Sequence, residues 1–162
     1  MLCRVLLFSA QIGKDKIEVK SLLKGMEDPH YVDAVPNFVR QVADADMVCL
    51  IGMDLEVGWL PKVLARSGNS KVQPGGAGYC DTGKQITVLE KPEGAVDRSM
   101  GDVHPQGNPH YWLSPKALGE GAAAIRDRLV AVDGANETFY RKNYDELVLR
   151  LQKIQDLNRA RI

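Results

Sequence analysis

The sequence lacks a basic surplus and a long hydrophobic run, and each absence excludes a broad class of function. Lysine and arginine together number 21, as do aspartate and glutamate, so the formal net charge of the 162 residues is zero. Neutralising nucleic-acid phosphates needs an excess of basic side chains, which argues against nucleic acid as the main partner. No apolar run approaches the ~20 residues that a membrane-spanning helix requires.

Cysteine is scarce, and Cys3, Cys49 and Cys80 are far apart. No C-x-x-C pair is present, so a cysteine zinc site is unsupported, and the odd number argues against a disulfide framework. Cys49 lies in the apolar run 47–51 and is predicted to be a buried small hydrophobic residue. Cys80 follows Gly78-Tyr79 in a loop-like stretch, where it could be exposed.

The first eight residues do not form a convincing secretion signal. Such a signal needs an apolar region of ~7–15 residues and a small-residue cleavage site. Arg4 interrupts the apolar stretch, and no such site follows. We interpret these residues as part of the fold, where their pattern fits either a strand or a helix.

The motifs of common enzyme classes are missing as well. The sequence has no H-E-x-x-H, no serine elbow and no obvious acid/base pair. The glycines of residues 74–78 do not precede a helix with a Lys-Ser/Thr pair, so a phosphate loop is not indicated. We therefore predict that the chain is not an enzyme, with a metal-dependent hydrolase as a minor alternative.

Hydrophobic periodicity and cap residues predict alternating short strands and helices. Such alternation is typical of an α/β domain with a mostly parallel sheet and flanking helices. Pro36 and the Ser114-Pro115 pair mark two helix starts, and Gly68-Asn69 marks a helix end. Residues 90–109 read as a long loop. The expected strands are 17–23, 47–51, 86–89 and a short 71–72, and the expected helices are 36–43, 59–67, 115–132 and a long one from 137 to the C-terminus.

Histidine is as scarce as cysteine, and two of the three histidines share one context. Asp28-Pro29-His30 and Asn108-Pro109-His110 each place a histidine directly after a proline. Proline locks its own φ, which stiffens the backbone just before the imidazole. A metal site built from loops needs imidazoles held in fixed directions, so this matched pair predicts metal binding.

The expected fold brings the two histidines to one edge of the sheet. Ligands of open α/β sheets gather beyond the carboxyl ends of the strands, and His30 and His110 each follow an expected strand. Imidazole favours Zn²⁺ over Mn²⁺. His104 lies on the long loop; a solvated histidine is the favoured interpretation and a third metal ligand the alternative. Asp54 and Glu56 are interpreted as surface caps of the next helix in preference to groups that support a metal site.

Several runs of residues resemble a known family. The likeness starts near Ile12, continues almost to the C-terminus, and is to the N-terminal lobe of solute-binding proteins that serve zinc- and manganese-importing ABC transporters. It is carried by residues 24–31, 36–42, 45–48, 52–56, Trp59-Leu60, 107–115 and 133–144.

The resemblance implies one lobe of a periplasmic-binding-protein-like fold. Residues 1–135 would form the metal-binding lobe, and 136–162 would form the long helix that links two lobes. His30 and His110 would be metal ligands, a second lobe would supply a histidine and an acidic residue, and an ABC permease would receive the ion. A periplasmic or cell-surface location would follow.

The sequence departs from this family pattern in three ways. No second lobe follows the linking helix, the start looks clipped within the family's first helix, and Ser114 stands where the family commonly has an aspartate. We therefore expect weak Zn²⁺ binding by the isolated chain unless it self-associates or meets a partner lobe. The competing hypothesis is a truncated remnant with no transport role.

Overall fold

The computed structural model describes residues 3–25, 27–89, 91–92, 94 and 104–161. Two short strands pair in parallel, with Val48 opposite Tyr79 and Leu50 opposite Asp81. The α/β class with a parallel sheet is therefore confirmed. The helices are α1 (Cys3–Gly13), α2 (Pro36–Ala43), α3 (Leu60–Ser67), α4 (Pro115–Val132) and α5 (Glu137–Arg159), the strands are β1 (Val48–Leu50) and β2 (Tyr79–Asp81), and short 3₁₀ turns include η2 (Ser70–Val72), η3 (Thr82–Gln85) and η5 (Tyr111–Leu113).

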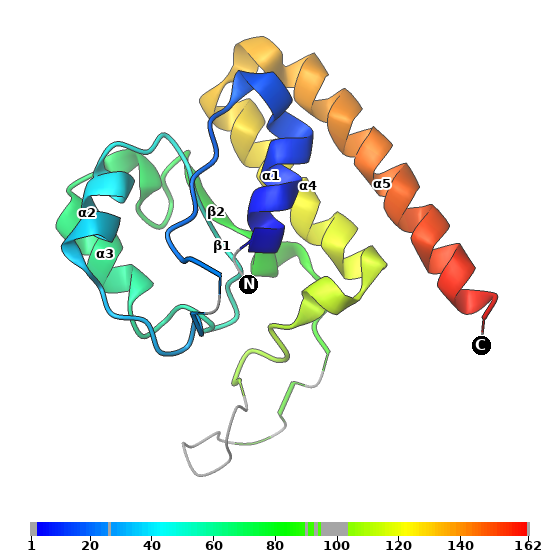
Figure 1. The fold of residues 1–162 in the computed structure, drawn as a ribbon, viewed down its shortest axis with the longest axis horizontal. Helices are drawn as coiled ribbons and strands as arrows, with labels where there is room; N and C mark the ends of the chain where they lie inside the picture. The colour runs from blue at the N-terminus through cyan, green and yellow to red at the C-terminus, as the bar shows by residue number, and fades with distance from the viewer. Residues whose placement is uncertain (1–2, 26, 90, 93, 95–103, 162) are drawn as a thin grey trace.

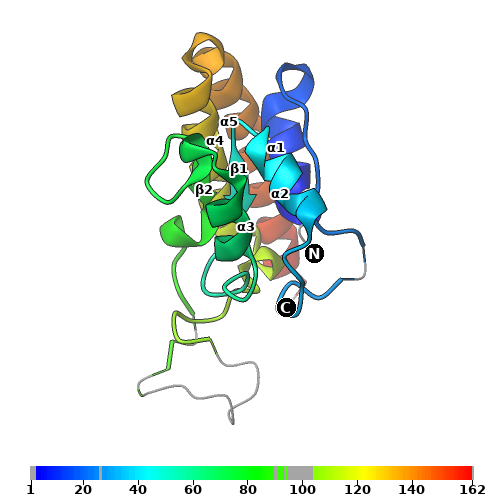
Figure 2. The same cartoon turned by 90° about the vertical axis from the view of Figure 1, so that its left-hand side faces the viewer.

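Helices lie on both sides of the strands, and each side has its own apolar core (Figure 1, Figure 2). The first core joins α1, α4 and α5 around Ile12, Ile125 and Tyr140. The second core joins α2 and α3 around Phe38, Trp59 and Val63. The strands run between the two cores, so the loops at their ends can contact residues of either core.

The helix boundaries follow the local signals of the sequence. α2 begins at Pro36, and α4 begins at Pro115 with the Ser114 hydroxyl accepting a hydrogen bond from the Ala117 amide. α3 ends at Gly68, whose φ of +66° is the left-handed conformation that glycine adopts without a steric penalty. These three predictions are confirmed.

The prediction of a strand at residues 17–23 is wrong. Residues 17–20 keep the alternating burial of a strand, and Ile17 is extended, but this segment pairs with no other strand in the described part of the chain. A pocket of about 820 Å³ is lined by Ile17 to Lys20 and by Met47 to Cys49. The segment therefore has the character of a strand but lies across a pocket from β1.

The second strand lies just after the glycines of residues 74–78, in a stretch that the sequence analysis describes as loop-like. Residues 86–89 are irregular and 71–72 belong to η2, so both strand predictions are wrong there. Strand β2 follows Gly78, whose missing side chain lets the chain approach the Asp46 carbonyl closely. The Val48 amide donates to the Gly78 carbonyl at 2.9 Å and starts the ladder. Cys80, for which the sequence allows exposure, is fully buried in β2, whereas Cys49, predicted to be buried, is only half-buried beside it.

The two terminal helices pack against each other. Residues 3–13 are helical, which settles the open choice between strand and helix. Asn143 of α5 donates to the Ile12 carbonyl at 2.9 Å, and Arg150 donates to Gln11 at 2.8 Å. Beyond this contact α5 runs away from the body of the molecule (Figure 1).

Among the described helices, none combines the length and the apolar character of a membrane span.

Candidate metal centre

His30 is held in a tight turn by the aspartate two residues before it. The Asp28 carboxylate accepts a hydrogen bond from the His30 amide at 3.0 Å and contacts the ring Nδ1 at 2.7 Å. The same oxygen serves both contacts, so the backbone and the ring are fixed together. With Nδ1 directed at the carboxylate, Nε2 is the atom that faces outward from the turn.

Two further observations describe the surroundings of this turn. Two hydrogen bonds from His30 lower the pKa of Asp28, and the bond from the backbone amide contributes more than the bond from the ring. The carboxylate is therefore ionised at neutral pH. The Trp59 indole donates to the Pro29 carbonyl at 2.9 Å. Trp59 is fully buried in the second core, so this hydrogen bond ties the His30 turn to that core.

The His110 turn repeats the side-chain hydrogen bond of the His30 turn. The Asn108 side-chain oxygen accepts a hydrogen bond from the His110 amide at 2.9 Å, again across a proline. The His110 ring meets the Trp112 ring edge-on, with centroids 4.8 Å apart. Trp112 is buried in the first core. The sequence likeness between the two tripeptides is thus a likeness of structure.

The His30 ring lies close to both of the other histidine rings. The centroids of His30 and His110 are 6.3 Å apart, and those of His30 and His104 are 5.2 Å apart. The Nε2 atoms of His30 and His104 are separated by 3.2 Å. His104 is half-buried against His30, so its favoured interpretation as a solvated loop histidine is wrong.

This spacing can be compared with the size of a zinc site. Two imidazole nitrogens at ~2.0–2.1 Å from a tetrahedral Zn²⁺ stand roughly 3.3 Å apart, close to the separation of the two Nε2 atoms. Within the described parts of the chain, no three histidine, cysteine or carboxylate side chains already form a group that could hold a metal ion. Metal binding by His30, His110 and His104 therefore stays a prediction.

The chain leaves β1 through an unusual backbone stretch. Gly52, Met53 and Asp54 follow the strand with φ values of +81°, +55° and +66°. A side chain on Gly52 would collide with the Asp81 carboxylate, so glycine is required there. Non-glycine residues adopt this conformation at a steric cost, which the surrounding contacts must offset.

Glu56 is buried at the end of this stretch, and its interpretation as a surface cap is wrong. Its two carboxylate oxygens accept hydrogen bonds from the amides of Ile51 and Gly52 at 2.8 and 3.1 Å. Burial raises the pKa of Glu56 to about 7, although these two amide hydrogen bonds oppose the shift. Burial also raises the pKa of the neighbouring Asp81. No local sequence signal marks Glu56 as buried, because the site depends on the left-handed backbone before it.

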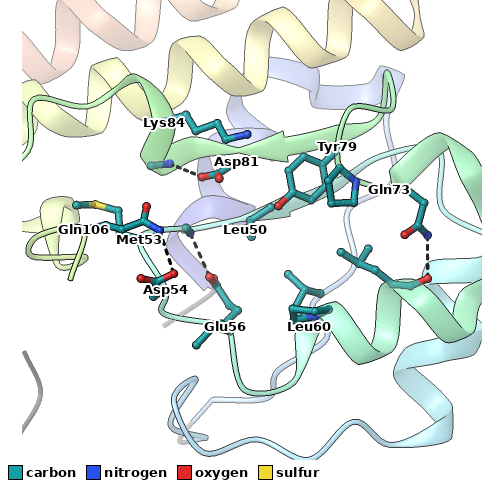
Figure 3. Close-up of a pocket in the computed structure, with 16 residues that line it drawn as sticks. Leu50, Met53, Asp54, Glu56, Leu60, Gln73, Tyr79, Asp81, Lys84 and Gln106 are labelled. Atoms are coloured by element: carbon teal, nitrogen blue, oxygen red, sulfur yellow. Dashed lines mark hydrogen bonds between the residues drawn. The ribbon is translucent and has the colours of Figure 1, made fainter. Parts of the chain in front are cut away.

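A pocket of about 460 Å³ opens beside Glu56 (Figure 3). Apolar side chains of β1 and α3 line one part, and Asp54, Asp81 and Gln106 line another. Asp54 lies at the rim, where its carboxylate accepts a hydrogen bond from the Gln106 amide at 3.1 Å. This contact joins the end of β1 to the segment that carries His104.

Comparison with known proteins gives a consistent class. The sequence model of the zinc-uptake complex component A, periplasmic, matches residues 6–162. The high-affinity zinc uptake protein ZnuA of Bacillus subtilis is 28% identical over 94% of this chain and 47% of its own length. A manganese-transporter substrate-binding lipoprotein of Streptococcus anginosus is 27% identical over 88% of this chain and 44% of its own length.

Solved structures agree with the sequence comparison. A metal-dependent lipoprotein of Bacillus subtilis matches with a TM-score of 0.76 and 26% identity, over 97% of this chain and 52% of that one. A zinc-bound ZnuA deletion mutant matches with a TM-score of 0.77 and 29% identity, over 96% of this chain and 54% of that one. The chain thus spans about half the length of the relatives it matches.

The matched proteins are, by their names, components of metal-uptake systems. This chain belongs to the family of the zinc-uptake complex component A, and the resemblance read from the histidine turns is confirmed.

Proposed function

We propose that this chain binds a divalent transition-metal ion, zinc foremost, as cargo for an ABC-type importer. His30 and His110 are the proposed ligands, and His104 is the proposed third. The observation that carries the proposal is the meeting of imidazoles from two loops 80 positions apart in the sequence, each in a proline-led turn. Relatives named for zinc, manganese and iron transport support the general function without selecting the metal.

The preference for zinc rests on ligand chemistry. Imidazole nitrogen suits Zn²⁺, whereas Mn²⁺ favours carboxylate and carbonyl oxygen. The Asp28 carboxylate at Nδ1 of His30 orients the ring, as carboxylates beside metal-binding histidines do. We also propose that residues 1–135 are the metal-binding lobe, that 136–162 are a linking helix, and that the location is periplasmic or at the cell surface.

Calorimetric titration of the 162-residue chain with ZnCl₂ tests the proposal. We expect weak binding by the parent and loss of at least tenfold in affinity in His30→Ala and in His110→Ala. Asp46→Asn is the matched control, because Asp46 is an exposed carboxylate paired with Lys71 elsewhere on the surface. Unchanged binding in both histidine variants would refute the site, and tight one-to-one binding by a monomer would contradict the expected weakness.

A further inference from the structure

The segment carrying His104 is tied to the end of β1 by one hydrogen bond, which the proposed function does not explain. Gln106 donates from its side-chain amide to the Asp54 carboxylate at 3.1 Å (Figure 3). Asp54 directly follows Met53 in the left-handed stretch after β1. Figure 3 shows the two side chains meeting at the rim of the pocket that Glu56 and Asp81 line.

His104 and Gln106 belong to the same tight turn. The Gly107 amide donates to the His104 carbonyl at 3.0 Å, which closes a four-residue turn with Pro105 at its second position. Proline fixes φ at this position. The direction of the His104 side chain is therefore linked to that of Gln106 through a stiff backbone.

The end of this turn is docked on the chain after η3. A side chain on Gly107 would collide with Val88 and approach Met53, and the Asn108 amide donates to the Leu89 carbonyl at 3.0 Å. These contacts hold the Gly107 end, next to the His110 turn. The contact between Gln106 and Asp54 holds the side nearer His104.

We infer that the hydrogen bond between Asp54 and Gln106 acts as a latch that positions His104 against His30. We call this contact the Asp54–Gln106 latch. It deepens the proposed function and rests on it: His104 is a third cargo ligand only when its turn lies flat against the end of β1. Asp54 and Gln106 are positioning residues that do not contact the ion.

Zinc titrations of latch variants test the inference. We expect Gln106→Ala and Asp54→Ala to weaken Zn²⁺ binding roughly three- to tenfold, the range for losing one solvent-exposed hydrogen bond. Asp54→Asn keeps an oxygen that accepts from Gln106, so its affinity should stay within about twofold of the parent. In a His104→Ala background, Gln106→Ala should cause no further loss.

A second readout separates the latch from the proposed function. In the zinc-free parent, nuclear Overhauser contacts between the His30 and His104 rings should be present, and Gln106→Ala should remove them while the urea midpoint stays unchanged. If zinc fails to bind the parent but these contacts depend on Gln106, the proposed function fails and the latch stands. If the contacts persist in Gln106→Ala, or if that variant weakens binding equally without His104, the latch is refuted.

Discussion

The His30 and His110 turns share one side-chain hydrogen bond but are supported from different cores. In both, a side-chain oxygen accepts the amide hydrogen of the histidine across a proline. Trp59 holds the His30 turn to the core around α2 and α3, whereas Trp112 joins the His110 turn to the core around α1, α4 and α5. The histidines therefore meet where two independently packed halves of the molecule come together.

The rings themselves are oriented by different means. Asp28 contacts the Nδ1 of His30 with a charged oxygen, whereas His110 lies edge-on against the indole of Trp112. A carboxylate at one ring nitrogen sets the tautomer and the direction of an imidazole, and an aromatic ring sets its position by packing. The His30 side of the site should therefore respond to changes of charge, and the His110 side to changes of packing.

The largest expected effect is on the free energy of unfolding, when the tyrosines that follow the two histidines are each replaced by alanine. Tyr111 packs against the first core with its hydroxyl at Thr82, whereas Tyr31 is 82% exposed. We expect Tyr111→Ala to lower the free energy of unfolding by about 3 kcal/mol and Tyr31→Ala to change it by less than about 0.5 kcal/mol. Urea denaturation measures both, and equal losses would contradict the unequal support of the two turns.

Glu56 lies on the side of the site that supports His30. Its backbone carbonyl accepts hydrogen bonds from the Trp59 and Leu60 amides at the start of α3, so a change in its side chain tests this support. In Glu56→Gln the side-chain NH₂ must face a backbone amide that has lost its acceptor. We expect a loss of about 1–3 kcal/mol in the free energy of unfolding at pH 8. Glu120→Gln, on α4, is the control. A neutral effect of Glu56→Gln would show that the buried carboxylate is dispensable.

The raised pKa of Glu56 gives the parent a pH dependence of known sign. Between its ordinary pKa of 4.5 and its folded pKa of about 7, the folded chain binds more protons than the unfolded chain. The free energy of unfolding therefore falls as pH rises through this window, by about 2–3 kcal/mol from Glu56. Asp81 adds to the fall, since burial raises its pKa too. Urea titrations from pH 4.5 to 8 should show a flatter profile in Glu56→Gln, and identical slopes would contradict this account.

The smallest expected effect is on Zn²⁺ affinity, when the first residues of the two turns are exchanged. Asp28→Asn keeps an oxygen for the His30 amide but loses the charge at Nδ1, so Zn²⁺ affinity should fall about tenfold. Asn108→Asp keeps its acceptor for the His110 amide, so affinity should change by less than about threefold. Competition with a chromophoric zinc indicator measures both variants. If Asn108→Asp lost more affinity than Asp28→Asn, charge would matter more on the His110 side than on the His30 side, which would contradict this account.

Sequence signals that act within a few residues predicted the structure well. Pro36 and the Ser114-Pro115 pair start their helices as expected, because a cap bonds to its own first turn. The two histidine turns could be read for the same reason: the residues that shape each are consecutive. The nearness of His30 to His110 was expected too, but from strands at 17–23 and 86–89 that the structure does not form.

Features that depend on distant neighbours could not be predicted. Residues 17–20 have the pattern of a strand but face a pocket, whereas Tyr79–Asp81 forms a strand after a glycine-rich link. Pairing decides these cases, and pairing is not written in the segment itself. The burial of Glu56 likewise depends on the left-handed backbone after β1. The contact of His104 with His30 joins residues 74 positions apart in the sequence.

The Asp28 and Asn108 hydrogen bonds each span only two residues, and this has a consequence for how such sites arise. A three-residue unit whose shape is encoded within itself can be moved to a new loop without rebuilding the scaffold. A second copy of the tripeptide would hold a second imidazole through its own local hydrogen bond. A pair of coordinating groups then needs only two loops that end close together. The chain carries two such tripeptides, and the surrounding cores have only to bring their imidazoles close together.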